Sequence, residues 1–281
     1  MTRGSCLCGT VRYEIAGPFT AMSHCHCSMC RKHHGAPFAT FAVAPLAGFR
    51  WLAGEHALGR YRSSAQGERL FCTTCGSVGP TLMPDHGLAI APAGNLEDDP
   101  GIRPQDHMFA ASKAPWHAIT DGLPQHAGYP PEFGGGLGVE RPAAATRLGT
   151  ISGSCLCGGV AYEIDAPLRM FNCHCSRCRR GRSAAHATNV IAKTDALRCL
   201  RGTELLAEHK PPEARFFAVA FCTRCGSAAP RISARGFAVV PAGTLDTDPG
   251  IRPQGHIYVG SKAPWFEITD DVPQFDEAPP P

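Results

Sequence analysis

The chain has 281 residues, of which 43% are apolar and 18% are charged, and its formal net charge at pH 7 is +3. A charge this small neither requires nor excludes a polyanionic partner, and we expect no nucleic-acid binding. No stretch approaches the roughly 20 apolar residues of a membrane span, and the N-terminus lacks the apolar core of a signal peptide, which together predict a soluble, cytoplasmic protein without membrane contacts.

Short apolar runs recur along the whole chain. In chain order they are residues 11–15, 38–43 and 88–91, and then 160–164, 186–191 and 237–240. The 31 glycines and 25 prolines break the chain between them every few residues, a pattern that favours short strands and turns over helices. We therefore predict a mainly β fold with little helix.

The sequence contains one unit twice, at an offset of 148 to 150 residues. Gly4-Ser5-Cys6-Leu7-Cys8-Gly9 returns at 153–158, and Phe71-Cys72-Thr73-Thr74-Cys75-Gly76-Ser77 returns, with one change, at 221–227. A tandem repeat of this size predicts two domains, residues 1–125 and 151–281, each able to bury its own core. Residues 126–150 between them are rich in Gly, Pro and Ala, which is typical of a linker.

Each copy carries seven cysteines in the order C-x-C, C-x-C-x-x-C, C-x-x-C, which accounts for all but one of the 15. An odd number cannot pair fully within one domain, and close spacing in a reducing compartment favours metal ligation over disulfides. Seven is also one set of four plus one set of three, the ligand counts of a closed structural zinc site and an open zinc site.

The outer cysteines of each copy are candidates for the closed site. Cys6 and Cys8 would share one face of an extended strand, while Cys72 and Cys75 lie in a turn whose following glycine permits positive φ. Four thiolates from two distant hairpins would staple the ends of the domain. The equivalent set is Cys155, Cys157, Cys222 and Cys225. An incidental redox pair or buried thiols are the alternative.

The middle cysteines, Cys25, Cys27 and Cys30 and then Cys173, Cys175 and Cys178, supply three thiolates and leave a fourth position for water, a side chain or a ligand. An open position is what a catalytic zinc keeps. In the competing structural interpretation, His26 or an exchange among the seven cysteines completes a closed site.

The motifs Gly-Ser-Cys-Leu-Cys-Gly, Cys-His-Cys-Ser-x-Cys-Arg and Phe-Cys-x-x-Cys-Gly-Ser, with a downstream Lys-Ala-Pro-Trp, resemble the glutathione-dependent formaldehyde-activating enzyme family, also called the centromere protein V family. The resemblance covers about residues 4–125 and 153–275. It implies two tandem Mss4-like zinc domains of short strands and hairpins. The outer cysteines would be structural ligands, and the middle cysteines would hold a catalytic zinc, giving up to four zinc ions per chain. It also implies glutathione as co-substrate and condensation with formaldehyde to S-hydroxymethylglutathione, which is a carbon-sulfur lyase reaction in reverse.

A thiol that enters the fourth position would lose its proton and could attack a small carbonyl carbon; run backwards, a carbon-sulfur bond breaks. A further group must move a proton to or from the hydroxyl oxygen. His26 and His174 adjoin ligands, but alternation along the chain points them away from the metal, so we expect them to pack or to support the ligands.

Basic pairs follow the third ligand in each copy, Arg31-Lys32 and Arg179-Arg180. They could bind the carboxylates of a glutathione-like substrate, balance the anionic zinc site, or form a solvated basic turn. His107 and His256 recur before the tryptophan segments, where packing and catalysis explain them equally well. Cys199 aligns with Trp51, so we expect it to be buried.

The copies differ near the middle cysteines, because Phe38 is replaced by His186 and Phe41 by Asn189. His186 is therefore a candidate catalytic residue, although one polar residue on a strand often faces solvent. Either the substrates differ or one copy has lost turnover.

The leading hypothesis is a zinc enzyme acting on small-molecule thiol and carbonyl substrates. A lyase for another thiol conjugate is the alternative within enzymes. A non-catalytic zinc-stabilised binding module, as the cytoskeletal and chromatin-associated branch of the family suggests, ranks third. That interpretation predicts a basic tail or stripe, which this chain lacks. The physiological substrate, the number of active domains, their relative orientation and the oligomeric state stay open.

Overall fold

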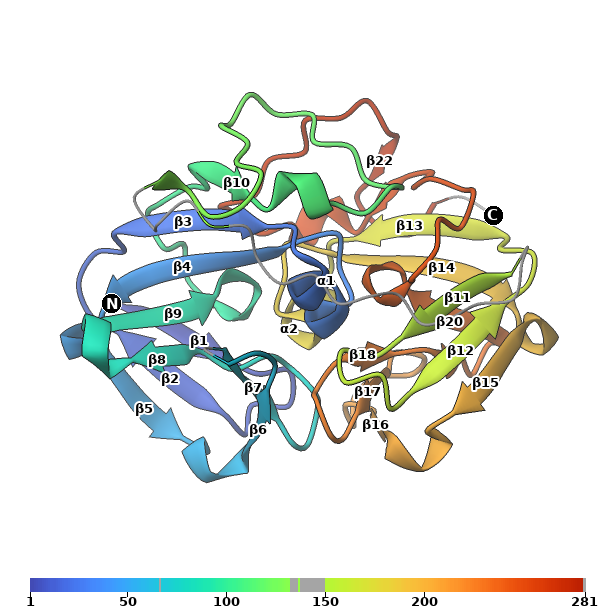
Figure 1. Cartoon of the computed structure of the whole chain (residues 1–281), viewed down its shortest axis with the longest axis horizontal. Coiled ribbons are helices and arrows are strands. Elements are labelled where there is room, and N and C mark those ends of the chain that lie inside the picture. The colour runs from blue at the N-terminus through green and yellow to red at the C-terminus, as the bar shows by residue number, and fades with distance from the viewer. Residues whose placement is uncertain (66, 132–135, 137–149, 280–281) are drawn as a thin grey trace.

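The computed structural model describes residues 1–65, 67–131, 136 and 150–279. Two halves of similar architecture lie side by side, and one short helix from each lies in the centre between them (Figure 1). Most of the linker expected at 126–150 falls outside the described residues.

The first half contains two sheets and a hairpin. The small sheet has the order β1 (Thr2–Ser5), β2 (Arg12–Ile15) and β5 (Phe49–Ala53). The larger sheet has the order β10 (Asp106–Met108), β3 (Ala21–Cys25), β4 (Ala39–Pro45), β9 (Leu88–Pro92) and β8 (Thr81–Met83). Only β10 and β3 pair in parallel in this sheet. Strands β6 (Leu58–Arg62) and β7 (Glu68–Cys72) form the hairpin.

The second half repeats this plan. Its small sheet is β11 (Ile151–Ser154), β12 (Ala161–Ile164) and β15 (Leu197–Arg201). Its larger sheet has the order β19 (Arg231–Ile232), β20 (Phe237–Pro241), β14 (Ala187–Lys193), β13 (Arg169–Cys173), β21 (His256–Ile257) and β22 (Gln274–Phe275). A third sheet contains β16 (Leu206–His209), β17 (Val219–Cys222) and β18 (Ala228–Ala229).

Helix α1 (Ser28–His34) and helix α2 (Ser176–Arg182) are the α-helices of the described chain. Each begins at a metal-ligand motif, because the Sγ of Cys27 or Cys175 caps it by accepting a hydrogen bond from the backbone three residues on. Each ends after two turns at a residue with positive φ, Gly35 or Ser183.

Short 3₁₀ turns join many strands. They are η1 (Leu46–Gly48), η2 (Glu55–Ala57), η3 (Pro84–His86), η4 (Ala93–Asn95), η5 (Ala110–Ser112), η7 (Thr194–Ala196), η8 (Thr203–Leu205), η9 (Ala242–Thr244) and η10 (Val259–Ser261). The predicted mainly β fold with little helix is confirmed.

The two hydrophobic cores exchange a segment. Ala263 and Trp265 of the second half pack into the core built around Tyr13, Ile15 and Met22, where Trp265 is 2% exposed. Reciprocally, Ala114 and Trp116 of the first half pack into the core of the second. Each core therefore contains residues of both halves, because the segment that ends each repeat crosses to the other half.

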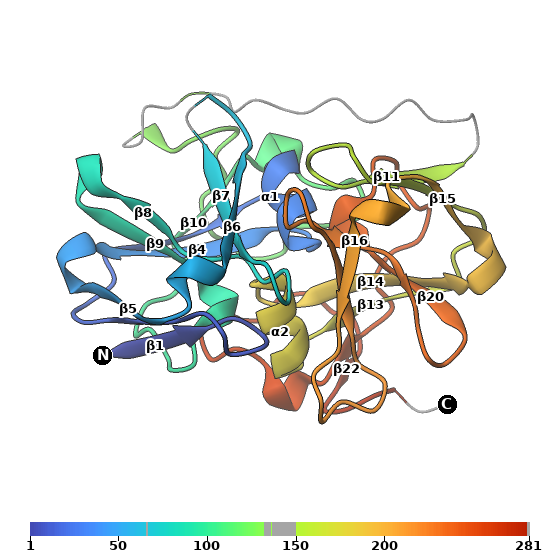
Figure 2. The same ribbon diagram turned by 90° about the horizontal axis from the view of Figure 1, so that it is seen from below.

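Equivalent residues of the two halves also contact each other. The rings of Phe71 and Phe221 lie 6.5 Å apart, and the Oγ1 atoms of Thr120 and Thr269 lie 2.6 Å apart. Contact between equivalent positions is the signature of a twofold axis, here within one chain. The close approach requires Gly76, because a Cβ there would lie 2.5 Å from the Phe221 ring. The helices and hairpins that surround this axis appear from a second direction in Figure 2.

No helix among the described residues is long and apolar enough to span a membrane.

Candidate metal centres

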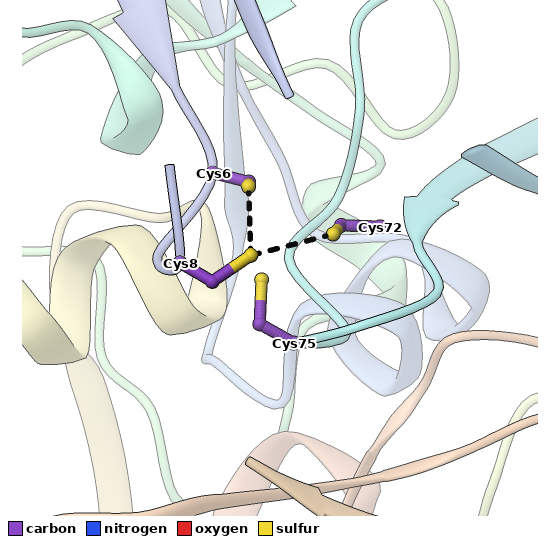
Figure 3. Close-up of side chains that lie close together, drawn as sticks. All are labelled: Cys6, Cys8, Cys72 and Cys75. Carbon is purple, nitrogen blue, oxygen red and sulfur yellow. Dashed lines mark hydrogen bonds between the residues drawn. The ribbon is translucent and has the colours of Figure 1, made fainter. Parts of the chain in front are cut away.

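Cys6, Cys8, Cys72 and Cys75 converge where the turn after β1 meets the turn after β7 (Figure 3). The Sγ of Cys8 lies 3.4 Å from that of Cys6 and 3.7 Å from that of Cys72, and all four sulfurs lie within 4.8 Å of one another. Cys6 and Cys8 belong to a tight turn, with Gly9 at φ +74°, and not to the extended strand we expected. The turn still directs both sulfurs to one point.

The spacing of these sulfurs fits zinc. Four thiolates at about 2.3 Å from a tetrahedral ion lie roughly 3.8 Å apart. The second set repeats the arrangement, with the Sγ of Cys157 lying 3.4 Å from that of Cys155 and 3.9 Å from that of Cys222. Each four-cysteine set can therefore hold one ion in a closed site.

Backbone and hydroxyl groups around each closed site suit thiolates. The amide of Val11 donates to Cys6 Sγ over 3.3 Å. Ser77 Oγ accepts the amide of Leu7 and lies 3.3 Å from Cys75 Sγ, so its hydroxyl proton is free to point at that sulfur. Val160, Leu156 and Ser227 make the same contacts in the second half.

The middle cysteines also converge, because Cys25 ends β3, Cys27 caps α1 and Cys30 lies in the first turn of α1. Their three sulfurs lie within 4.8 Å of one another, as do those of Cys173, Cys175 and Cys178. Within the described chain, these groups contain no fourth Cys, His, Asp or Glu ligand. The competing interpretation with His26 as fourth ligand is not what the structure shows.

The histidines between the ligands belong to a hydrogen-bonded row. His26 Nε2 lies 2.8 Å from His107 Nδ1, and His107 Nε2 lies 2.9 Å from Asp121 Oδ1. His174, His256 and Asp270 repeat the row at 2.8 and 3.0 Å. A neutral His107 that donates its Nε2 proton to Asp121 accepts from His26 at Nδ1.

This row of hydrogen bonds holds the loop that carries Cys25 and Cys27, which we call the ligand loop. Burial, followed by the neighbouring His117 and His107, lowers the pKa of His26 to about 2, so its imidazole is neutral. The backbone of the loop is also fixed, because the amide of His26 donates to the Met108 carbonyl over 2.9 Å. The supporting role expected for His26 and His174 agrees with these contacts, and His107 and His256 supply the partners.

The basic residues after the third ligand each contact a group of the protein. Lys32 is buried and lies 2.5 Å from Asp246 of the other half, so it is held in the contact between halves and not on a substrate. Arg180 lies 3.5 Å from Glu97 in the equivalent contact. Arg31 Nε donates to the His26 carbonyl, and Arg179 Nε donates to the Ser261 carbonyl.

His186 is 4% exposed, so it does not face solvent. Its ring lies 5.0 Å from that of His174 and 5.8 Å from that of Phe38, its equivalent in the first half. Burial and the neighbouring His174 and His256 hold the pKa of His186 well below its ordinary value. The described contacts make it a packing partner of the ligand loop.

Two further features differ from the sequence-based expectations. Cys199 is exposed on β15, so the expectation that it is buried is wrong. Arg69 was not foreseen as a site residue, yet its Nη1 lies 3.6 Å from Cys30 Sγ. The Arg69 position, three residues before Cys72 in a strand, carries no spacing signal that links it to Cys30.

Comparisons with known proteins show which family the chain resembles. The family model described as "Glutathione-dependent formaldehyde-activating enzyme" matches residues 1–112 and again 150–261. A Halomonas elongata protein named "Putative glutathione-dependent formaldehyde-activating enzyme" is 28% identical over 142 residues, which is 47% of this chain and 90% of that protein.

Two further similarities cover less. A Schizosaccharomyces pombe protein named "Uncharacterized lyase C29B12.13" is 31% identical over 75 residues, 27% of this chain and 53% of that protein. A crystal structure of a Rhodobacter sphaeroides protein covers 36% of this chain and 97% of its own, with 27% sequence identity and a TM-score of 0.30.

Proposed function

The chain belongs to the glutathione-dependent formaldehyde-activating enzyme family, and we propose that it is a zinc-dependent enzyme that makes or breaks the carbon-sulfur bond between a glutathione-like thiol and formaldehyde or another small carbonyl compound. Small-molecule substrates would then be its partners. The two relatives named above as a formaldehyde-activating enzyme and as a lyase support this class of reaction.

The observation that carries the proposal is the pair of three-cysteine clusters beside two four-cysteine clusters. A four-thiolate site is saturated, whereas three thiolates leave one position of a tetrahedral ion for an incoming group. Zinc bound there would supply a Lewis acid that favours the thiolate form of a substrate thiol.

The overall reaction is balanced without any other reagent. The thiol sulfur forms a bond to the carbonyl carbon, the carbon-oxygen double bond becomes single, and the thiol proton ends on the new hydroxyl oxygen. In the reverse direction, the carbon-sulfur bond breaks and its electron pair returns to sulfur. No oxidant or reductant is needed.

The protein groups around each cluster position the ligands. Cys27 Sγ accepts the amide of Cys30 at 3.3 Å, and Cys175 Sγ accepts the amide of Cys178 at 3.4 Å. The histidine and aspartate rows hold the loop between the first two ligands, as described above. Binding of substrate to a preformed site lowers the entropic cost of bringing thiol and carbonyl together.

The test measures the rate at which zinc-loaded protein brings glutathione and formaldehyde to equilibrium, by exchange NMR with subtraction of the protein-free rate. We expect a rate above that background, and we expect its loss in the Cys27→Ser, Cys175→Ser double variant, provided that circular dichroism shows a folded chain. An unchanged rate in the double variant contradicts the proposal. A zinc-loaded wild type that accelerates no thiol-carbonyl pair favours a binding module.

A further inference from the structure

The two three-cysteine clusters differ in exposure. In the first half Cys25, Cys27 and Cys30 are 4%, 8% and 5% exposed. In the second half Cys173 is buried, but Cys175 and Cys178 are both partly exposed. A tripeptide-sized thiol needs access to the open coordination position, so this difference bears directly on where it can bind.

Residues of the first half close the first cluster. Strand β7 passes next to α1 and brings Arg69 to 3.6 Å from Cys30 Sγ (Figure 2). Phe109 packs on the cysteines, and the Tyr129 ring packs on Phe109 with 4.7 Å between the ring centroids. Met29, Phe41 and Met108 complete an apolar cover.

The second half has replaced the closing cation. Val219 is the equivalent of Arg69. Arg69 pairs with Tyr61 of the preceding strand, and Val219 pairs with His209, which is the equivalent of Tyr61. Valine cannot neutralise a thiolate or donate a hydrogen bond. Tyr258, which follows β21 as Phe109 follows β10, is 38% exposed.

Arginines lie at two positions of the second half where the first half has other residues. Arg182 ends α2, four residues after Cys178, and is 8% exposed, whereas Arg231 on β19 is partly exposed. Burial lowers the pKa of both guanidinium groups, and the nearby Cys178 opposes this effect. The equivalents of Arg182 and Arg231 in the first half are His34 and Thr81.

Further arginines of the second half contact an aromatic ring or a carboxylate. Arg215 and Arg235 lie 4.7 and 4.5 Å from the centre of the Phe216 ring, and the charge of Arg235 reaches Tyr258. Arg177, which replaces Met29, is 3.3 Å from Glu213. The carboxylate of Glu208 acts on Arg231, and that of Glu277 acts on Tyr258.

We propose that the two halves have divided their roles: the second-half cluster, whose Cys175 and Cys178 are partly exposed, takes an anionic thiol such as glutathione, while the first-half cluster, covered by Arg69 and Phe109, is a closed metal centre that receives no substrate. This inference rests on the proposed function, since it says which of two sites carries it out. Guanidinium groups suit the two carboxylates of glutathione, which bring a net negative charge to the site.

The test titrates glutathione into the zinc-loaded full-length chain by calorimetry. We expect one binding site per chain, and we expect Arg231→Ala to raise the Kd about tenfold because it removes a charge-assisted contact. Arg60→Ala is the control, since Arg60 is exposed on the first-half hairpin and pairs with Glu68. Two equal sites, no binding, or equal effects of the two substitutions would overturn the proposal.

A second readout does not involve substrate. The zinc-loaded protein is exposed to a chelator and iodoacetamide, and labelled cysteines are located by mass spectrometry. We expect Cys175 and Cys178 to be labelled before Cys27 and Cys30; simultaneous or reversed labelling contradicts the division. A chain that binds one glutathione without accelerating any reaction would refute the proposed function alone, whereas turnover with two equal sites would refute the division alone.

Discussion

Lys32 and Asp246 form an ion pair across the two halves, with 2.5 Å between Nζ and Oδ1 and both side chains at most 7% exposed. Lys32 Nζ also donates to the hydroxyl and carbonyl oxygens of Ser154. Burial lowers the pKa of Lys32, and Asp246 opposes this effect. The equivalent pair, Arg180 and Glu97, is 3.5 Å long and about one-third exposed. One fold thus contains a buried and a solvated version of the same contact.

Lys32→Met should destabilise the protein by about 3–5 kcal/mol, because Asp246 would remain as a buried, unpaired charge. Arg180→Met is the matched control and should cost about 0–1 kcal/mol, since its pair is partly solvated. Chemical denaturation of both variants measures the difference. Equal losses would show that burial does not distinguish the two contacts.

Trp265→Ala should lower the free energy of unfolding by about 3–5 kcal/mol, as expected for a buried aromatic side chain. Because Trp265 packs into the first-half core, hydrogen exchange should speed up on β2 and β4 of that half. Trp116→Ala should affect β12 and β14 in the same way. Faster exchange confined to the half that carries the substitution would contradict the segment exchange.

His117→Phe should make stability less dependent on pH. Burial, followed by the charges of His107 and Lys113, lowers the pKa of His117 from 6.5 to about 4. The unfolded chain therefore binds a proton that the folded chain excludes, and stability is lost as pH falls from about 6.5 towards 4. Between pH 6.5 and 5.5 this one group costs about 1 kcal/mol.

Phenylalanine is present at the equivalent position, Phe266, so the substitution keeps an aromatic ring beside His26 and Phe38. The denaturation midpoints of the wild type and of His117→Phe are measured across this pH range and subtracted at each pH. Acid affects the thiolates of both proteins equally, so that contribution cancels. Parallel pH profiles would show that His117 does not exclude the proton.

Cys72→Ser and Cys27→Ser should have different consequences. Cys72 joins the turn after β7 to the turn after β1, so its loss should release one zinc. A loss of about 1 kcal/mol lowers a melting temperature by a few degrees, and we expect a clearly larger decrease here. Cys27→Ser should also lose zinc but should keep the fold, because serine retains an oxygen that can cap α1. Thermal unfolding with metal analysis distinguishes them, and a Cys72→Ser chain that melts like the wild type would contradict a structural role.

The repeat, the strand content and the grouping of the cysteines could be predicted because they depend on local spacing. Cys-x-x-Cys before glycine specifies a turn whatever its surroundings, and the short apolar runs match β4, β9 and β20 to within about two residues. The helices were missed, because seven residues that include four basic side chains give no apolar periodicity.

Contacts between the halves could not be predicted. Nothing in the sequence around Lys32 shows whether it faces solvent or pairs with Asp246, 214 residues further along the chain. Trp116 is apolar enough to be buried in the core of either half. Arg69 is a similar case, since its contact with Cys30 depends on how the β6–β7 hairpin lies against α1. These positions depend on three-dimensional packing around the internal twofold axis and not on local pattern.

The most direct measurement is the zinc content of the chain, purified without added metal or chelator, determined by elemental analysis against protein concentration. The account predicts about four zinc ions per chain, one for each cysteine cluster. A content of about two, unchanged when Cys27 and Cys175 are replaced together by serine, would show that the three-cysteine clusters hold no metal and would contradict the proposed chemistry.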